Sequence, residues 1–134
     1  MLLAPWTAEG ARATISAMGR TVLIVDDHPS FRASAKRMLQ ADGYDVVGEA
    51  ADGSSAIDAV RELRPEVVLL DIRLPDVDGF EVAERLAGGG TAPAVVLTPS
   101  HDRSDFSYEI ARCPARGFVP KSELSAEAIT SLIG

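Results

Sequence analysis

Five polar residues stand where apolar runs of the sequence end, and their chemistry is complementary. Asp26 and Asp71 each close an apolar run, Asp27 follows Asp26, Thr98 closes a third run, and Lys121 comes shortly after a fourth. The runs concerned are 21–26, 66–71, 94–98 and 116–119. In an open α/β sheet, ligands bind at the carboxyl ends of the strands. We therefore expect three carboxylates, one hydroxyl and one ammonium to converge on one rim of a sheet.

Such a set of side chains suits phosphoryl chemistry supported by a divalent cation. Crowded carboxylates repel one another, and burial raises that cost, so a cation must neutralise them. Mg²⁺ takes carboxylate oxygens, keeps several waters and commonly shares its remaining positions with phosphate. A carboxylate can also attack a phosphoryl group and form an aspartyl phosphate. Mg²⁺, Lys121 and Thr98 would then stabilise the charge on the equatorial oxygens.

The elements that must position these residues alternate between strand and helix. Strands are predicted over residues 21–26, 44–50, 66–71, 94–98 and 116–119, and the first, third and fourth are continuously apolar, as in strands covered on both faces. Helical periodicity marks residues 29–41, 54–64, 79–87, 104–112 and 124–133. Strands that alternate with helices predict an α/β fold with a parallel sheet.

Composition limits the remaining choices. A chain of 134 residues has the size of one domain, and its net charge of −7 disfavours direct binding to nucleic acid. The single cysteine, Cys113, allows no internal disulfide and favours a reducing, cytoplasmic compartment. No apolar run approaches the roughly 18 residues of a membrane span. Residues 1–19 are predicted to be a poorly ordered extension, followed by one domain over 20–134.

Four segments together resemble a known family. VLIVDDH, VVLLDIRLPDVDGFE, VVLT and GFVPK, in this order and spacing, are similar to the receiver domain of two-component response regulators, of the LuxR and NarL type. The resemblance covers about residues 20–133. It implies a doubly wound, five-stranded parallel sheet of order 2-1-3-4-5 with helices on both faces.

The resemblance also implies roles for individual residues. Asp71 would be the phosphoacceptor, and Lys121 would pair with the phosphoryl group. Asp27 would bind Mg²⁺ directly and Asp26 largely through water, with the main-chain carbonyl of Arg73 as a further ligand.

Two further positions resemble the family's switch. Thr98 would turn toward the phosphoryl group, and Phe118 would follow it. The donor would be a phosphohistidine on a sensor histidine kinase or phosphotransfer protein. An unidentified downstream protein would read the change, and a homodimer formed on activation is a further implied assembly. The domain would catalyse the transfer to its own Asp71 without acting as a turnover enzyme.

Each landmark also has a simpler explanation. Asp26 and Asp27 could cap the helix that follows them, and residues 76–79 are typical of a turn and a helix cap. Phe118 could serve packing alone. His28 and His101 are both expected to be solvated loop residues, and Cys113 is expected to be a small buried hydrophobe.

Two positions depart from the family pattern. Pro99, after Thr98, has no N–H to offer a phosphoryl oxygen, so we hypothesise that one stabilising hydrogen bond is missing. Ser122 stands where many receivers have a proline after the lysine, which excludes a cis-proline there.

Alternative functions follow from the same residues. A phosphatase acting through an aspartyl phosphate would place a second acid close after Asp71, where Ile72 and Arg73 stand instead. A pseudo-receiver that binds a partner without phosphorylation is also open. Only 13 residues follow Lys121 (134 − 121), which favours a receiver that stands alone, although a receiver fragment of a longer DNA-binding transcriptional regulator is the alternative.

Overall fold

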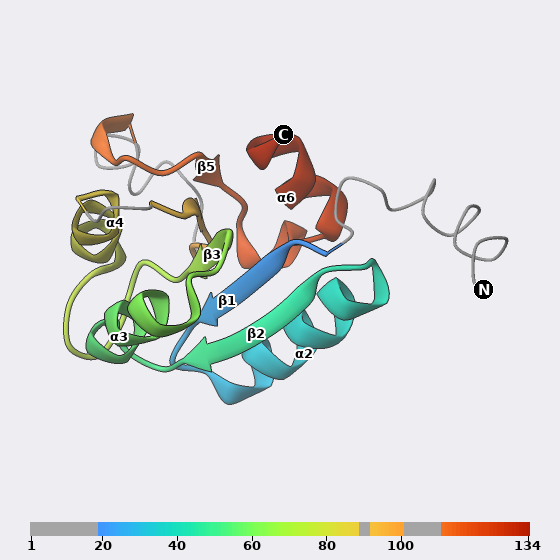
Figure 1. The fold of residues 1–134 in the computed structure, drawn as a ribbon, viewed down its shortest axis with the longest axis horizontal. Helices are drawn as coiled ribbons and strands as arrows, with labels where there is room; N and C mark the ends of the chain where they lie inside the picture. The colour runs from blue at the N-terminus through green and yellow to red at the C-terminus, as the bar shows by residue number, and fades with distance from the viewer. Residues whose placement is uncertain (1–18, 89–91, 101–110) are drawn as a thin grey trace, which may run out of the picture.

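A five-stranded parallel sheet forms the centre of the protein (Figure 1). The computed structural model describes residues 19–88, 92–100 and 111–134. The strands lie in the order β2-β1-β3-β4-β5, which confirms the predicted fold and strand order. Their bounds are β1 (Thr21–Val25), β2 (Asp45–Ala50), β3 (Val67–Leu70), β4 (Ala94–Leu97) and β5 (Gly117–Phe118). Each strand is one or two residues shorter than the run that predicted it, so the polar end residues lie in the loops.

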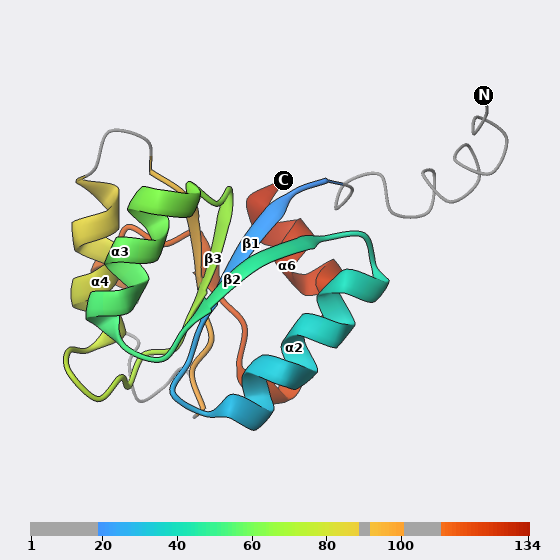
Figure 2. The same cartoon turned by 60° about the horizontal axis from the view of Figure 1, so that its bottom comes forward.

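Helices cover both faces of the sheet. Among the described residues the α-helices are α2 (Pro29–Ala41), α3 (Gly53–Leu63), α4 (Gly79–Ala87) and α6 (Ala126–Ile133). Figure 2 shows α2 and α6 on one face and α3 and α4 on the other. The helix predicted over residues 104–112 falls outside the described residues except for its last two, and the extension predicted over 1–19 does so except for Gly19. Among the described residues, no helix combines the length and apolar character needed to cross a membrane.

Alternation along the strands builds two apolar layers. Val22 and Ile24 of β1 pack with α2 and α6, while Leu23 and Val25 pack with α3 and α4. Successive side chains of a strand point to opposite faces, so a strand buried on both sides must be apolar at every position. The four residues of β3 are each at most 1% exposed. The continuous apolar runs of the sequence therefore mark the centre of the sheet.

Side-chain caps set the starts of three helices. The carboxylates of Asp52 and Asp78 accept hydrogen bonds from the main-chain N–H groups of Ser55 and Glu81, at the starts of α3 and α4. The hydroxyl of Ser125 caps α6 in the same way. The predicted start of the last helix near residue 124 is therefore wrong. Residues Lys121–Glu123 form a short 3₁₀ turn instead, and α6 begins at Ala126.

Candidate functional site

Strand register brings three polar residues side by side. Val25, Leu70 and Leu97 are neighbours across β1, β3 and β4. The residues that follow them, Asp26, Asp71 and Thr98, therefore lie in line at the carboxyl edge of the sheet. Each is at most 2% exposed, and they are the buried polar residues of the described chain. Main-chain hydrogen bonds hold the row in place, from Asp71 N to Val25 O at 3.0 Å and from Thr98 N to Leu70 O at 2.9 Å.

Lys121 reaches this row from the loop after β5. Its Nζ lies 2.6 Å from Asp26 Oδ2 and 3.4 Å from Asp71 Oδ2, and the side chain is only 15% exposed. The same Asp26 oxygen accepts no aligned hydrogen bond, so charge alone joins it to the ammonium. The main-chain N–H of Lys121 donates to Pro99 O at 3.0 Å, which ties the lysine to the end of β4. The ring of Phe31 on α2 lies 4.8 Å from Nζ and completes the lysine's surroundings.

The acidic pair does not cap the helix that follows it. His28 occupies the N-cap position of α2, and its side chain makes no capping hydrogen bond. Asp26 Oδ1 instead accepts from the main-chain N–H of His28 at 2.8 Å. His28 Nδ1 lies 2.9 Å from Asp26 Oδ1 and 3.1 Å from Asp27 Oδ1. The simpler interpretation of the pair as a helix cap is thus wrong, and His28, although 61% exposed, contacts the site.

The electrostatics of the site favour a cation. Burial raises the pKa of Asp71 above its ordinary value, the charge of Asp26 raises it further, and Lys121 opposes both effects. Three carboxylates face one ammonium, so the ionised cluster carries excess negative charge. One ligand atom from each of Asp26, Asp27, His28 and Asp71 lies within 4.8 Å of the others. An acidic cluster that is rich in hard oxygen donors and carries excess negative charge fits Mg²⁺.

The loop after Asp71 is fixed from both ends. Arg73 pairs with Asp78 in an isolated antiparallel bridge, and Gly79 N donates to Ile72 O at 2.6 Å. A Cβ on Gly79 would overlap the main-chain oxygen of Asp71, so glycine is required by the close approach. The carbonyl of Arg73, predicted to bind the metal, belongs to this fixed loop.

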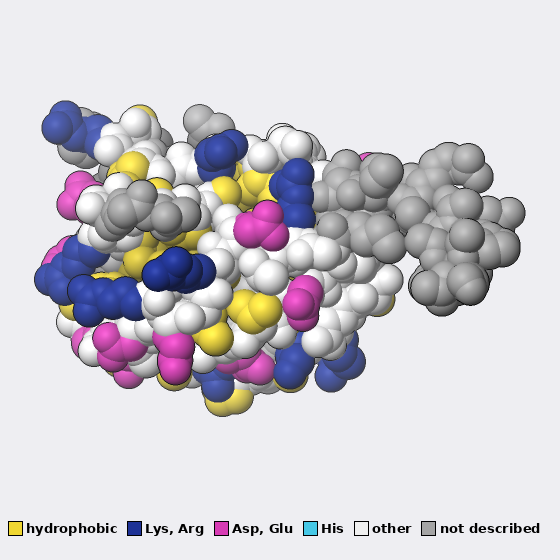
Figure 3. Space-filling view, in the orientation of Figure 1, with side chains coloured by type: hydrophobic (Ala, Val, Ile, Leu, Met, Phe, Trp, Pro, Cys, Tyr) yellow, Lys and Arg dark blue, Asp and Glu magenta, His cyan; other side chains and the backbone are white. Residues whose placement is uncertain are grey.

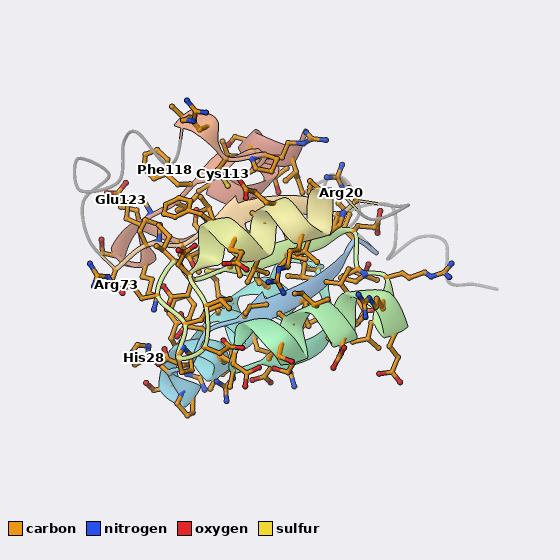
Figure 4. All side chains as sticks on the ribbon, turned by 90° about the vertical axis from the view of Figure 1, so that its left-hand side faces the viewer. Arg20, His28, Arg73, Cys113, Phe118 and Glu123 are labelled. Carbon is orange, nitrogen blue, oxygen red and sulfur yellow. The ribbon has the colours of Figure 1, made fainter. Side chains whose placement is uncertain are left out.

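Thr98 follows the end of β4, and Phe118 lies in the neighbouring strand β5, in different surroundings. The Oγ1 atom of Thr98 is buried and, among the described residues, has no hydrogen-bond partner. A buried oxygen without a hydrogen bond costs folding free energy, unless a ligand or a side-chain rotation supplies the missing bond. Phe118 of β5 pairs with Leu97 of β4, and its side chain is half-buried against the core layer that packs with α3 and α4. Figure 4 shows Phe118, Arg73 and His28 toward one end of the molecule and Arg20 toward the other.

Sequence patterns missed three contacts of the site region. His28 and Phe31 precede or begin a helix, and nothing in their spacing shows that they reach Asp26 or Lys121. Asp76 Oδ1 and Oδ2 accept from the main-chain N–H groups of Gly53 and Ser54, which lowers the pKa of Asp76 and ties its loop to α3. The turn and cap predicted for residues 76–79 are confirmed by Asp78, whereas the link to α3 joins residues 23 positions apart. His101 lies outside the described residues.

Comparison with known proteins decides the family. A family model described as the response regulator receiver domain matches residues 22–133. The chain belongs to this family. The receiver is 42% identical over 113 residues to a positive alginate biosynthesis regulatory protein of Pseudomonas aeruginosa, covering 81% of this chain and 45% of the relative. It is 38% identical over 131 residues to the transcriptional regulatory protein PdtaR of Mycobacterium tuberculosis, covering 89% and 64%.

Solved structures agree with the fold. The signal receiver domain of the response regulator NarL from Mycobacterium tuberculosis matches with a TM-score of 0.75 and 30% identity, over 87% of this chain and 98% of that one. A LuxR-family response regulator from Aurantimonas matches with a TM-score of 0.75 and 31% identity, over 84% and 86%. The receiver spans about half the length of most of the curated relatives it matches. Receivers are signalling domains in general rather than turnover enzymes.

Proposed function

We propose that this receiver is a phosphorylation switch in which Asp71 accepts a phosphoryl group from a phosphohistidine. The donor is a sensor histidine kinase or a phosphotransfer protein. One observation carries the proposal: the buried carboxylate of Asp71 lies 3.4 Å from Lys121 Nζ, and the hydroxyl of Thr98, which has no hydrogen-bond partner among the described residues, follows the next strand. Packing alone does not explain a buried acid, a cation and an unsatisfied hydroxyl at the same edge of the sheet.

The transfer needs little covalent chemistry from the protein. An oxygen of Asp71 forms a bond to phosphorus, and the bond from phosphorus to the donor imidazole breaks. The bonding pair stays on the imidazole nitrogen. Lys121 and Thr98 would stabilise negative charge on the phosphoryl oxygens, as preorganised donors do in phosphoryl transfer. Burial and the charge of Asp26 raise the pKa of Asp71, whereas the ammonium of Lys121 opposes this effect and so favours the ionised nucleophile.

Asp26, Asp27 and Asp71, with the main-chain carbonyl of Arg73, would hold the Mg²⁺ ion. When bound, the ion neutralises excess carboxylate charge and polarises the phosphoryl oxygens. His28 keeps the two acids of the pair oriented, since its ring and main-chain nitrogens contact both.

The phosphoryl group would be sensed by Thr98. Within the described part of the chain, its hydroxyl has no hydrogen-bond partner to lose when it turns toward a new oxygen. Phe118 of the neighbouring strand pairs with Leu97, the residue before Thr98, and its inward rotation would be driven by packing because phenylalanine has no hydroxyl. The surface around β5 and α6 would then change its affinity for a downstream protein or for a second receiver.

Two properties of the relatives support a role in gene regulation. Those compared are named as regulatory proteins, and most are about twice as long as this chain. We propose the cytoplasm as the site of action, in keeping with the single cysteine.

Treatment with a small phosphodonor and Mg²⁺ tests the proposal, with intact mass as the readout. The chain is expected to gain one phosphoryl group, and Asp71→Asn is expected to gain none. Asp58→Asn, which neutralises an exposed acid on α3, is the matched control and should behave as the unaltered chain. An equal gain in Asp71→Asn would refute the assignment.

A further inference from the structure

The amino edge of the sheet, opposite the acidic site, carries a cavity of about 320 Å³. Arg20, Arg64 and Arg116 line it, and each directly or closely precedes a strand, namely β1, β3 and β5. Apolar residues form much of the remaining wall, among them Pro65, Val67 and Ile133. Figure 3 looks onto this face of the molecule, where basic side chains border hydrophobic ones close to the point at which the described chain begins.

None of the three guanidinium groups forms an ion pair with a side-chain carboxylate of the described residues. Arg20 donates to the main-chain oxygen of Gly134, at 3.3 Å. The one acid in the cavity wall, Glu66, accepts a hydrogen bond from the main-chain N–H of Thr21. The wall therefore carries three positive charges against one negative charge in a chain whose net charge is −7. Elsewhere, Arg32 contacts Glu49 at 2.9 Å.

The backbone at Arg64 gives an independent reason to look here. Arg64 has a φ of 49° and ends α3 in the left-handed region. Glycine is the usual residue at such a position, because other residues lose free energy there. An arginine in this unfavourable backbone conformation suggests that its side chain has a role, and Arg64 lines the cavity.

We infer that this cavity binds a small polyanion that carries at least two phosphate or carboxylate groups. Planar guanidinium groups bind both kinds of oxyanion through paired hydrogen bonds. Two or more anionic groups are required to match the excess positive charge. The volume lies at the lower end for small-molecule sites, and the apolar wall can accept the organic part of such a ligand. The site is separate from the phosphoacceptor, so it does not depend on the proposed function.

Binding can be tested by two-dimensional NMR of the ¹⁵N-labelled chain at physiological ionic strength, in buffer freed of divalent cations. Pyrophosphate and citrate are the probes for the two chemistries, and orthophosphate is the single-group comparison. We expect saturable shifts of the amides of residues 64, 66, 67, 116, 117, 133 and 134 with at least one of the two probes. Orthophosphate should bind more weakly.

Arg64→Gly separates binding from folding, since glycine suits the local backbone. It should weaken binding by about tenfold or more, the effect of losing a charged hydrogen-bond donor, while the melting temperature stays the same or rises. Arg85→Ala, at an arginine of α4 paired with Glu81, should leave binding unchanged. Equal affinity in Arg64→Gly, or no saturable shift with either probe, would overturn the inference. Tighter binding of a hexaglutamate peptide than of both probes would overturn the assignment to a small molecule.

Discussion

The two edges of the sheet are both charged, but they differ in sign and in how the charge is held. At the carboxyl edge, Asp26 and Asp71 are buried and share the Nζ of Lys121. At the amino edge, Arg64 and Arg116 are exposed and have no carboxylate partner among the described residues. Buried charges must be paired, whereas exposed charges need not be. Folding of the carboxyl edge therefore depends on the cation of Lys121, whereas the arginines of the amino edge are free to bind a ligand.

Removing one cation from each edge should change the free energy of unfolding differently: Lys121→Ala should lower it, whereas Arg64→Gly should leave it constant or raise it. Lys121→Ala leaves two buried carboxylates without compensation and should lower the free energy of unfolding by about 3 kcal/mol at neutral pH without metal. Phosphorylation of Asp71 should slow by about 10²-fold, as expected for a lost charge-stabilising donor. Urea unfolding and the rate of mass gain are the measurements.

Lys36→Ala provides the control for this change, because the exposed Lys36 lies 3.9 Å from Glu49 and should contribute less than about 1 kcal/mol. If both lysine variants unfold alike, the carboxyl edge is not held by Lys121.

Gly79→Ala tests the close approach of the backbone at the carboxyl edge. The new methyl group would overlap the main-chain oxygen of Asp71, and relief of this contact should cost about 2 kcal/mol of unfolding free energy. Gly88→Ala at the end of the same helix is the matched control, since its nearest contact would be an ordinary 3.7 Å. Equal unfolding midpoints for the two variants would contradict the close approach.

The pH dependence of stability gives a third test of the carboxyl edge. Because the folded protein raises the pKa of Asp71, the folded state binds this proton more tightly, and ionisation of Asp71 opposes folding. Without metal, Asp71→Asn should therefore be more stable than the unaltered chain at neutral pH. The difference should shrink as the pH falls through the raised pKa and vanish below the ordinary value of 3.8. Urea midpoints that differ equally at all pH values would contradict this assignment.

Pro99→Ala makes a smaller change at the same edge. It restores a main-chain N–H beside Thr98, and one added donor should alter the rates of phosphorylation and decay by roughly tenfold or less. Unchanged rates would show that the missing N–H is without consequence.

Arg64→Gly should have the smallest effect on folding and the opposite sign to Lys121→Ala. Relief of the left-handed strain is partly offset by the greater freedom of glycine in the unfolded chain, so stability should stay constant or rise by up to about 1 kcal/mol. A loss of stability comparable to that of Lys121→Ala would remove the distinction between the edges.

The difference between the edges also explains what could be predicted. Asp26, Asp71 and Thr98 end apolar runs, and parallel register alone places the ends of such runs in a row, so the sequence was sufficient to bring them together. The start of α6 was missed because Leu124 fits the apolar pattern, although the hydroxyl of Ser125 makes the cap. Contacts such as Phe31 with Lys121 depend on packing between distant elements. The arginine cavity has no periodic signal, since its residues stand in loops before strands rather than after them.

Location of the phosphoryl group tests the central claim most directly. Borohydride reduces an aspartyl phosphate to homoserine, and peptide sequencing by mass spectrometry then identifies the modified residue. After reaction with a phosphodonor and Mg²⁺, we predict homoserine at position 71 and at no other aspartate. Homoserine at position 26 or 27, or a phosphorylated chain that yields none at position 71, would contradict the assignment of Asp71 as the phosphoacceptor.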